Sequence, residues 1–366
     1  MSPDTTFPRA AAGRSGWRAR LAAILRAHYE RAARKDKAVG VLTRKKRWEV
    51  LFTCFRELRA MGYMIENPAN LGERHVQALV ARWDGAGQSA ATIQNKLSLL
   101  RIFARWIGKP GLVRASAAYA STPGRLRRAY AARVDKSWSA HGVDFDALVT
   151  RVSTYDRYVG VQLKLAEAFG LRRQEAVLIK PLRSWQGEYL RVIAGTKGGR
   201  ERLVHVVSDQ QRAVLEEACA LAHANRGFIS ERRLTKTQAL RRFTYVLDRC
   251  GVTRAELGVT AHGLRHEFAN RRLESLGIVS PVRGGAKGQL PREEEAAAKL
   301  TVSEELGHSR LDVTAAYYGT HRRLPGRGTL IRAAKARAAV LAGQESLSEA
   351  ELRELQALAR ELLDAG

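Results

Sequence analysis

The chain has 366 residues, and its 63 Lys and Arg against 36 Asp and Glu give a formal net charge of +27. A compact protein so cationic repels itself and indicates a polyanionic partner, with nucleic acid as the first candidate. The hydrophobic content of 45% excludes a disordered basic tail. No run reaches the roughly 18 apolar residues that cross a bilayer. The first residues also lack the apolar core of a secretory signal, so we expect a soluble, cytoplasmic protein.

Residues 1–40 are predicted to be a basic extension. Trp17, Leu21 and Leu25 recur at helical spacing between arginines, which predicts a basic amphipathic helix. A targeting peptide is disfavoured because acidic residues interrupt the segment. We expect either an arm that docks on phosphates or a frayed surface helix.

Residues 41–115 predict a helical, DNA-binding domain with one basic side. Ser89 is positioned to cap a helix in which Ile93, Leu97 and Leu100 share one face. The polar sides of this helix and of an earlier one carry the candidate DNA contacts Arg44, Lys45, Lys46, Gln94, Lys96 and Arg101. The alternative is that these residues only form a solvated basic face. The net charge makes contact with DNA phosphates an equally supported interpretation.

A linker or a loosely packed helix is predicted for residues 116–143, and a second domain for residues 144–325. Most of the second domain has helical periodicity, but residues 189–194 and 202–207 have the pattern of strands. The glycine-rich loop between these strands places Lys197 at the tip of a hairpin. The expected fold class is therefore mainly α with one small antiparallel β-sheet (α+β). A basic stretch and an amphipathic helix are predicted for residues 326–366.

Two histidines and an arginine recur at helical spacing in His262-Gly-Leu-Arg265-His266. The preceding Thr260 is the predicted cap of this helix, and His262 and Arg265 share one of its faces. The spacing of the histidines also occurs in zinc sites, but Gly263 stands where the zinc motif has its glutamate. An arginine one turn away fits an anion site better than a cation site, so we expect no metal and no cofactor.

Three further segments carry residues suited to chemistry. They are Gly170-Leu171-Arg172 with Glu175 after it, Lys197 at the hairpin tip, and Leu306-Gly307-His308 with Tyr317 and Tyr318 after it. A tyrosine, with an ordinary pKa of about 10, is a weak nucleophile until cations or a base stabilise its phenolate. Each segment alone is a weak signal, and two tyrosines before a glycine are commonly a packing pair.

Together and in this order, Arg172, Lys197, His262-x-x-Arg265, His308 and Tyr317 resemble the motif set of the tyrosine recombinases, also called the phage integrase family. The resemblance covers residues 42–318, and the helix after Ser89 looks like part of the family's core-binding domain. It implies a helical core-binding domain followed by a tyrosine-recombinase-like catalytic domain. Alignment on Leu306-Gly307-His308 favours Tyr317 over Tyr318 as the nucleophile.

The resemblance also implies a mechanism. Tyr317 would attack a DNA phosphodiester, form a 3′-phosphotyrosine and release a 5′-hydroxyl that later reverses the step, without ATP or metal. Arg172 and Arg265 would stabilise the charge on the non-bridging oxygens. The remaining implied roles are proton donor to the departing 5′-oxygen for Lys197, general base or its support for His262, and hydrogen-bond donor to the phosphate for His308.

The function implied is integration or excision of a prophage or other mobile element in a bacterium. The implied partners are double-stranded DNA attachment sites, further copies of the chain in a tetramer on DNA, and accessory DNA-bending proteins, with no membrane. A nicking topoisomerase of type IB is an alternative with the same chemistry, and a catalytically inactive architectural DNA-binding protein is one from another class. The helical domain ahead of the catalytic half favours the recombinase, and the complete residue set disfavours an inactive protein.

Residues 278–300 depart from the family pattern. They separate the His262 helix from Leu306-Gly307-His308 by more than the resemblance leads us to expect, as an inserted loop and short helix. A partner or DNA contact and a tolerated surface insertion are equally open. The predicted C-terminal helix is expected either to dock on a neighbouring protomer or to pack within its own.

Overall fold

The computed structural model describes residues 16–28, 39–196, 199–308 and 311–321. The chain divides into two compact units, with Ala129 the last residue of the first and Tyr130 the first of the second. Each unit has its own apolar core. In the described part of the chain, no helix combines the length and apolar character that crossing a membrane requires. The finer domain limits given above remain predictions.

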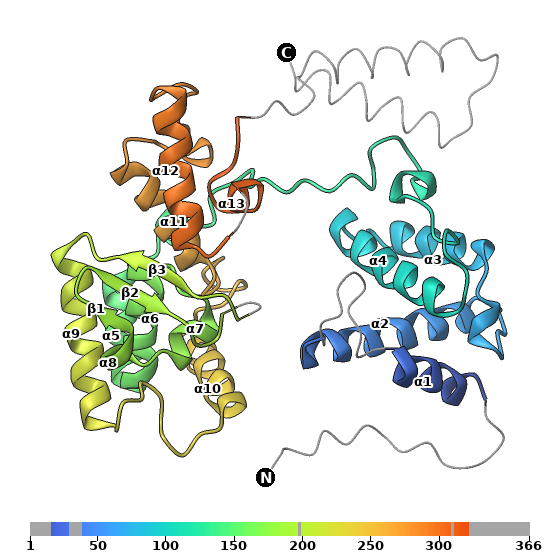
Figure 1. Ribbon diagram of the computed structural model, residues 1–366, viewed down its shortest axis with the longest axis horizontal. Coiled ribbons are helices and arrows are strands. Elements are labelled where there is room, and N and C mark those ends of the chain that lie inside the picture. Colours follow the sequence, from blue (N-terminus) through green and yellow to red (C-terminus); the bar gives the residue numbers. More distant parts are fainter. Residues whose placement is uncertain (1–15, 29–38, 197–198, 309–310, 322–366) are drawn as a thin grey trace. The chain divides into compact units, whose positions relative to one another are not determined.

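The described residues of the first unit form four α-helices (Figure 1). They are α1 (Trp17–His28), α2 (Val41–Ala60), α3 (Glu73–Gly85) and α4 (Ala90–Trp106), with short 3-10 turns η1 (Pro68–Asn70) and η2 (Ser116–Tyr119). The predicted cap is confirmed, because Ser89 Oγ accepts a hydrogen bond from the Thr92 backbone N–H at 3.2 Å. Ile93, Leu97 and Leu100 are fully buried, as their shared helical face requires.

Helix α1 packs against the rest of the first unit. Trp17 is 4% exposed, Leu21 and Leu25 are fully buried, and all three belong to the core of the first unit. The Trp17 ring stacks on Phe55 of α2 with centroids 6.2 Å apart. The predicted amphipathic helix is confirmed, but it is not a free or frayed segment, because its apolar stripe has a partner in the same unit. Contact of its basic side with phosphates stays a prediction. Most of the remaining predicted extension lies outside the described residues.

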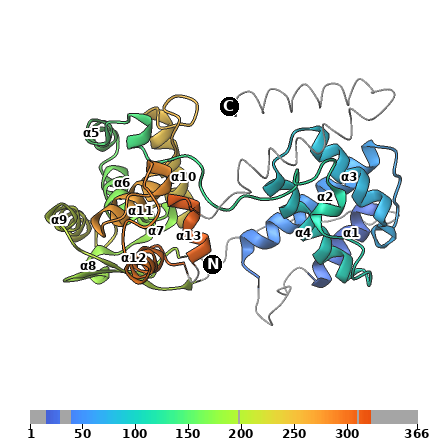
Figure 2. The ribbon, with the colours of Figure 1, turned by 90° about the horizontal axis from the view of Figure 1, so that it is seen from above.

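The second unit is mainly helical (Figures 1 and 2). Its helices are α5 (Phe145–Tyr155), α6 (Arg157–Phe169), α7 (Arg173–Leu178), α8 (Pro181–Ser184), α9 (Asp209–Ala224), α10 (Lys236–Arg249), α11 (Gly263–Ser275), α12 (Arg292–Glu305) and α13 (Leu311–Tyr318), with 3-10 turns η3 (Ser139–His141) and η5 (Pro281–Arg283). Helix α6 is buried on most sides and packs against α5, α9 and α11. It is the central helix around which the second unit is built.

The second unit also holds one antiparallel sheet, in the order β1-β2-β3. The strands are β1 (Trp185–Gln186), β2 (Tyr189–Val192) and β3 (Arg202–His205), with Leu190 opposite Val204. Helix α8 contacts β1 and β2, and α12 contacts β3. The predicted fold class and the two predicted strands are confirmed. The sequence missed β1, whose two residues are too few to show an alternating pattern.

Two predicted helix limits were wrong. Helix α11 begins at Gly263, and Thr260 does not cap it; its carbonyl oxygen accepts from Trp138 Nε1 at 2.8 Å instead. The inserted short helix is longer than predicted and runs to Glu305 as α12, because nothing interrupts the helical pattern after Pro291. No α-helix forms between 116 and 143, where all residues are described. The predicted C-terminal stretch, 326–366, lies outside the described residues.

Candidate active site

Arg172 is placed by a helix break that requires glycine. Helix α6 ends at Gly170, whose φ is +56°, and a Cβ at that position would lie 2.5 Å from Phe268 Cδ1. The chain can therefore turn tightly against α11 before α7 begins. The Arg172 backbone N–H donates to Glu175 Oε2 at 2.7 Å, which fixes the start of α7. The Arg172 side chain stays 21% exposed, so it reaches both the interior and solvent.

Arg265 lies at the centre of the site and is fully buried. Its Nε donates to Tyr317 Oη at 3.0 Å, and Nη1 donates to the Gly170 carbonyl at 2.5 Å. Its Nη2 donates to the Leu306 carbonyl and lies 3.4 Å from His308 Nε2. Burial lowers the pKa of Arg265 to about 10, so the guanidinium is still a cation at neutral pH. One side chain thus joins the ends of α6 and α12 to α13.

The turn after α12 brings His308 to the two arginines. The Leu306 carbonyl accepts from Arg265 and also from Arg172 Nη2, the latter at 3.2 Å. Gly307 follows with a φ of +65°, and a Cβ there would lie 3.0 Å from Arg202 Cδ. The motifs around Arg172, Arg265 and His308, which are far apart in sequence, therefore meet at one carbonyl group.

Tyr317 faces this group of cations, whereas Tyr318 does not share its surroundings. Tyr317 is 7% exposed, and the guanidinium carbon of Arg265 lies 5.3 Å from its ring centroid. The ring centroids of His262, His266 and His308 lie 5.7, 4.9 and 5.7 Å from that of Tyr317. Tyr318 is 3% exposed in the apolar core, and burial raises its pKa well above the ordinary value. Only Tyr317 combines a hydroxyl–arginine contact with three neighbouring imidazoles.

His262 is held in the neutral form. Burial above all, and then the neighbouring His266, Arg265 and Arg172, lower its pKa to about 4. A neutral imidazole has an unprotonated ring nitrogen that can accept a proton, and the low pKa also makes it a weak base. His266, to which the sequence assigned no role, is 6% exposed, and its Nδ1 lies 3.3 Å from the Tyr317 carbonyl oxygen. It therefore contacts the backbone of the candidate nucleophile.

Glu175 and Arg202 support the site from within the protein. Glu175 is fully buried and accepts from Arg202 Nη1 and Nη2 at 2.8 and 2.7 Å, and from Arg172 Nη1 at 2.7 Å. Although burial alone would raise it, the bonds from Arg202 and Arg172 hold the pKa of Glu175 below its usual value. Arg202 Nε also donates to the Glu305 carbonyl at 2.7 Å. Sequence reasoning missed Arg202; its signal was a cation on the buried side of an alternating strand, in phase with Val204.

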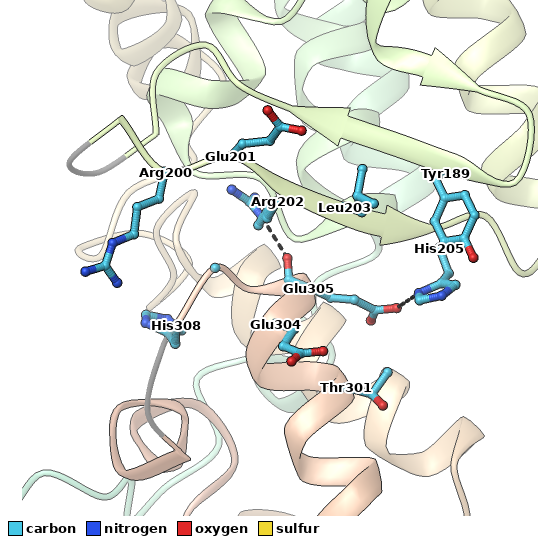
Figure 3. Close-up of a pocket in the computed structure, with 11 residues that line it drawn as sticks. Tyr189, Arg200, Glu201, Arg202, Leu203, His205, Thr301, Glu304, Glu305 and His308 are labelled. Carbon is cyan, nitrogen blue, oxygen red and sulfur yellow. Dashed lines mark hydrogen bonds and ion pairs between the residues drawn. The ribbon is translucent and has the colours of Figure 1, made fainter.

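A cavity of about 440 Å³ adjoins the site between the sheet and α12 (Figure 3). Arg200 and His308 lie at one end of it, and Tyr189, His205 and Thr301 at the other. Lys197, the candidate proton donor, lies outside the described residues. It belongs to the β2–β3 loop, of which Arg200 is a described part.

The predicted DNA contacts lie on α2 and α4, and several are engaged within the first unit. Lys45 and Lys46 are exposed in the first turns of α2. Gln94 donates to the Leu126 carbonyl at 2.6 Å, and Lys96 Nζ lies 4.3 Å from the centre of the Trp83 ring. Arg101 donates to the carbonyls of Val113 and Arg114 at 3.2 and 2.5 Å, and Arg44 is partly buried. Gln94, Lys96 and Arg101 of α4 therefore contact neighbouring parts of the first unit. Contact of these side chains with DNA stays a prediction.

No group of three or more His, Cys, Asp and Glu side chains within the described ranges is arranged to hold a metal ion. The buried cations of the site have carbonyls, a carboxylate and a phenol as their neighbours. Guanidinium groups so placed attract an anion, and in their fork geometry they suit the oxygens of a phosphate.

Two protein families match the sequence. The family described as phage integrase, N-terminal, matches residues 24–113, and the family described as integrase matches residues 127–271. Together the two matches cover more than half of the chain. No curated protein matches it significantly.

Solved structures of integrases share the fold. A lambda integrase (75–356) dimer bound to a COC′ core site is similar with a TM-score of 0.52 at 15% identity, covering 84% of this chain and 96% of that one. A lambda integrase tetramer bound to a Holliday junction gives 0.53 at 15% identity, covering 84% and 79%. The Tn1549 transposon integrase with circular intermediate DNA gives 0.50 at 13% identity, covering 87% and 98%. With the two family matches and the shared fold, this chain belongs to the tyrosine recombinase, or phage integrase, family.

Proposed function

We propose that this protein is a site-specific recombinase that breaks and rejoins DNA strands through Tyr317, to integrate or excise a prophage or other mobile element. The observation that carries the proposal is the hydrogen bond from Arg265 Nε to Tyr317 Oη at 3.0 Å inside a buried, cation-lined site. Family membership supports the breakage and rejoining of DNA, and the similar structures are integrases bound to core-site, Holliday-junction and circular-intermediate DNA.

In the cleavage step, Tyr317 Oη attacks the scissile phosphorus and forms a 3′-phosphotyrosine as the bond to the 5′-oxygen breaks. The phenol proton passes to His262, whose neutral imidazole lies beside the tyrosine ring. Lys197 donates a proton to the departing 5′-oxygen. The 5′-hydroxyl of the partner strand then attacks the phosphotyrosine and restores the tyrosine. Because the phosphodiester energy is stored in the covalent intermediate, the scheme requires neither ATP nor a metal.

Arg265 and Arg172 supply the positive charge for this step. Each guanidinium has five N–H donors. The contacts of Arg265 to Tyr317, Gly170 and Leu306, and of Arg172 to Glu175 and Leu306, use only part of this capacity. The remaining donors can bond the non-bridging phosphate oxygens as negative charge develops on them. His308, whose Nε2 faces Arg265, is placed to add a further hydrogen bond.

Cations outside the active site would position DNA, and further copies of the chain would complete the assembly. Arg44, Lys45, Lys46 and cations elsewhere on the first unit would position duplex DNA by phosphate contact. We propose a tetramer of this chain on two attachment sites, with accessory DNA-bending proteins as further partners. A topoisomerase would share the chemistry but would not join two DNA molecules.

The test uses DNA carrying an attachment site, identified from the junctions that flank the gene. The protein is incubated with a nicked form of this site, and an SDS-resistant adduct is mapped to a residue. We expect the adduct on Tyr317, its loss in Tyr317→Phe and its retention in Tyr318→Phe, all in the presence of a chelator and without ATP. An adduct that survives in Tyr317→Phe and disappears in Tyr318→Phe assigns the nucleophile to Tyr318 instead.

The same preparation separates the alternative functions. A recombinase joins strands from two attachment-site DNAs, whereas a topoisomerase relaxes supercoiled DNA and yields no joint product. The absence of any adduct on a verified attachment site would favour an architectural DNA-binding protein.

A further inference from the structure

The segment by which the chain enters the second unit is firmly packed. This entry segment, residues 132–139, contains Ser137, which is fully buried, and Trp138, which is 1% exposed. Ser139 donates to Glu267 through its backbone N–H at 3.0 Å and through Oγ at 2.9 Å. Asn270 Nδ2 lies 3.2 Å from Ser137 Oγ. The entry segment is thus bonded along α11, the helix that carries Arg265.

The inserted segment after α11 has a defined turn that directs Arg283 inward. A Cβ on Gly285 would lie 1.8 Å from the Val279 carbonyl oxygen, so only glycine lets the chain fold back there. The Gln289 side chain closes the turn, since it accepts from Val279 N at 2.9 Å and donates to Val279 O at 2.8 Å. This part of the insertion is therefore an ordered turn with its own hydrogen bonds. Both interpretations of the insertion, a partner or DNA contact and a tolerated surface insertion, stay predictions.

Arg283 connects the insertion to the entry segment. Its Nε donates to Asp135 Oδ2 at 2.9 Å, Nη2 to Glu267 Oε1 at 2.9 Å, and Nη1 to Glu274 Oε1 at 3.0 Å. The side chain is 19% exposed, and those of Asp135 and Glu267 are 11% and 10% exposed. One guanidinium therefore binds three carboxylates from the entry segment and α11. Without it, Asp135 and Glu267, which are both largely buried, would lose the cation they share.

The same two segments hold α13 on both sides of Tyr317. The Ala132 backbone N–H donates to the Ala315 carbonyl at 2.9 Å, two residues before Tyr317. Two residues after it, a Cβ on Gly319 would lie 3.0 Å from Val282 Cγ1 and 3.2 Å from the Ala132 carbonyl oxygen. Turn η5 and the entry segment thus form a bracket around the backbone of the candidate nucleophile.

We propose that Arg283 is a positioning residue for Tyr317, which it aligns by clamping the entry segment and η5 around α13. The inference rests on the proposed function, because it concerns the nucleophile of that reaction. The entry segment begins just after the boundary between the units. The contacts of Arg283 therefore also connect the start of the second unit to the backbone around Tyr317. Arg283 touches none of the reacting groups and acts only through the backbone of α13.

The test compares full-length Arg283→Met with Arg271→Met. Arg271 lies on α11 and pairs with Glu167, so the control removes the same charge and an ion pair but leaves the bracket intact. The rate of adduct formation is measured on a nicked attachment site at saturating protein, and DNA affinity and thermal unfolding are measured separately. Misplacing a nucleophile by about 1 Å can lower a rate by about 100-fold, so we expect at least a tenfold loss in Arg283→Met.

DNA affinity of Arg283→Met should stay within about twofold of that of Arg271→Met, because the two variants carry the same charge. Arg283→Lys should recover part of the rate, since it keeps the charge but not the forked contacts. A rate in Arg283→Met equal to that of Arg271→Met overturns the proposal. If the wild-type protein forms no adduct at all, the proposed function fails, which is a different outcome.

If Arg283→Met does not fold, a second pair of variants tests the positioning role. Ala132→Pro removes the N–H that binds the Ala315 carbonyl, and Ala131→Pro introduces the same ring one residue earlier without touching that bond. We expect slower adduct formation in Ala132→Pro than in Ala131→Pro at equal DNA occupancy. Equal rates in the two proline variants would show that the bracket does not position Tyr317.

Discussion

The two units bury very different side chains. In the described part of the first unit the buried polar residues are Arg47 and His75, and the rest of its core is apolar. In the second unit Glu175, Arg202, Arg265, Glu267 and Glu305 are each less than 9% exposed and bonded to one another or to backbone. Burial of ion pairs adds little net stability, and removal of one partner costs much. The first unit is thus built for stability, whereas the second uses buried charge to hold a fixed arrangement of donors.

The largest expected effect tests whether the buried charge of the second unit serves chemistry. Arg265→Ala should lower the rate of adduct formation at saturating DNA by about 1,000-fold, because it removes the donor to Tyr317 and to the developing phosphate charge. Arg271→Ala, on the same helix, is the control and should stay within about threefold, because Arg271 is 43% exposed and pairs with Glu167 rather than with Tyr317. A loss in Arg265→Ala no larger than in this control would mean that the buried arginine is only structural.

The next prediction compares one substitution in the core of each unit. Glu175→Gln should lower the stability of the second unit by about 3 kcal/mol, because Arg172 and Arg202 lose their carboxylate, and should slow cleavage as well. Leu97→Ala should lower the stability of the first unit by a similar amount, about 3 kcal/mol, through a cavity. Urea unfolding and single-turnover cleavage at low temperature measure both quantities. If Leu97→Ala slows cleavage at saturating DNA as much as Glu175→Gln does, the two cores do not differ in their effect on the active site.

A third prediction concerns pH. The pKa of His262 is lowered to about 4, so the folded protein keeps this imidazole neutral where the unfolded chain, with a pKa of 6.5, takes up a proton. Between these values the unfolded chain binds more protons, and His262 therefore makes stability fall as pH falls from 6.5 to 4. For free enzyme and DNA, the acid limb of the cleavage profile due to His262 should lie near pH 4. An acid limb near pH 6.5 that is absent in His262→Gln would contradict this prediction.

The smallest expected effect lies in the first unit. Lys45→Ala with Lys46→Ala should weaken DNA binding by less than about tenfold at moderate salt and reduce the salt slope by about 0.9 for each phosphate that the lysines no longer neutralise. The cleavage rate at saturating DNA should not change, because these exposed lysines lie in the other unit. Titrations at several salt concentrations measure the slope, with Lys164→Ala, a lysine paired with Glu217, as the control. An unchanged slope would remove the two lysines from the DNA contacts.

The sequence predicted what depends on local periodicity. The helix that Ser89 caps and the strands β2 and β3 follow from apolar spacing and capping residues, which act between near neighbours. Local patterns predicted the helix α1 but not that it joins a core, because an amphipathic stripe does not reveal whether a partner will cover it. They also missed β1, which exists only because β2 lies beside it.

The candidate catalytic residues could be named from motif order, but no local pattern tells which buried groups hold them. The Arg202–Glu175 pair and the contacts of Arg283 join residues 27 and 148 positions apart in the chain. Such contacts form only when elements distant in sequence pack together, and a lone arginine in a strand or loop looks the same whether it meets DNA or a buried carboxylate. The sequence by itself determined the family and the fold class, and it predicted the reacting groups. Only the tertiary structure decided which cations are committed inside the protein and how Tyr317 is held, because both depend on long-range burial.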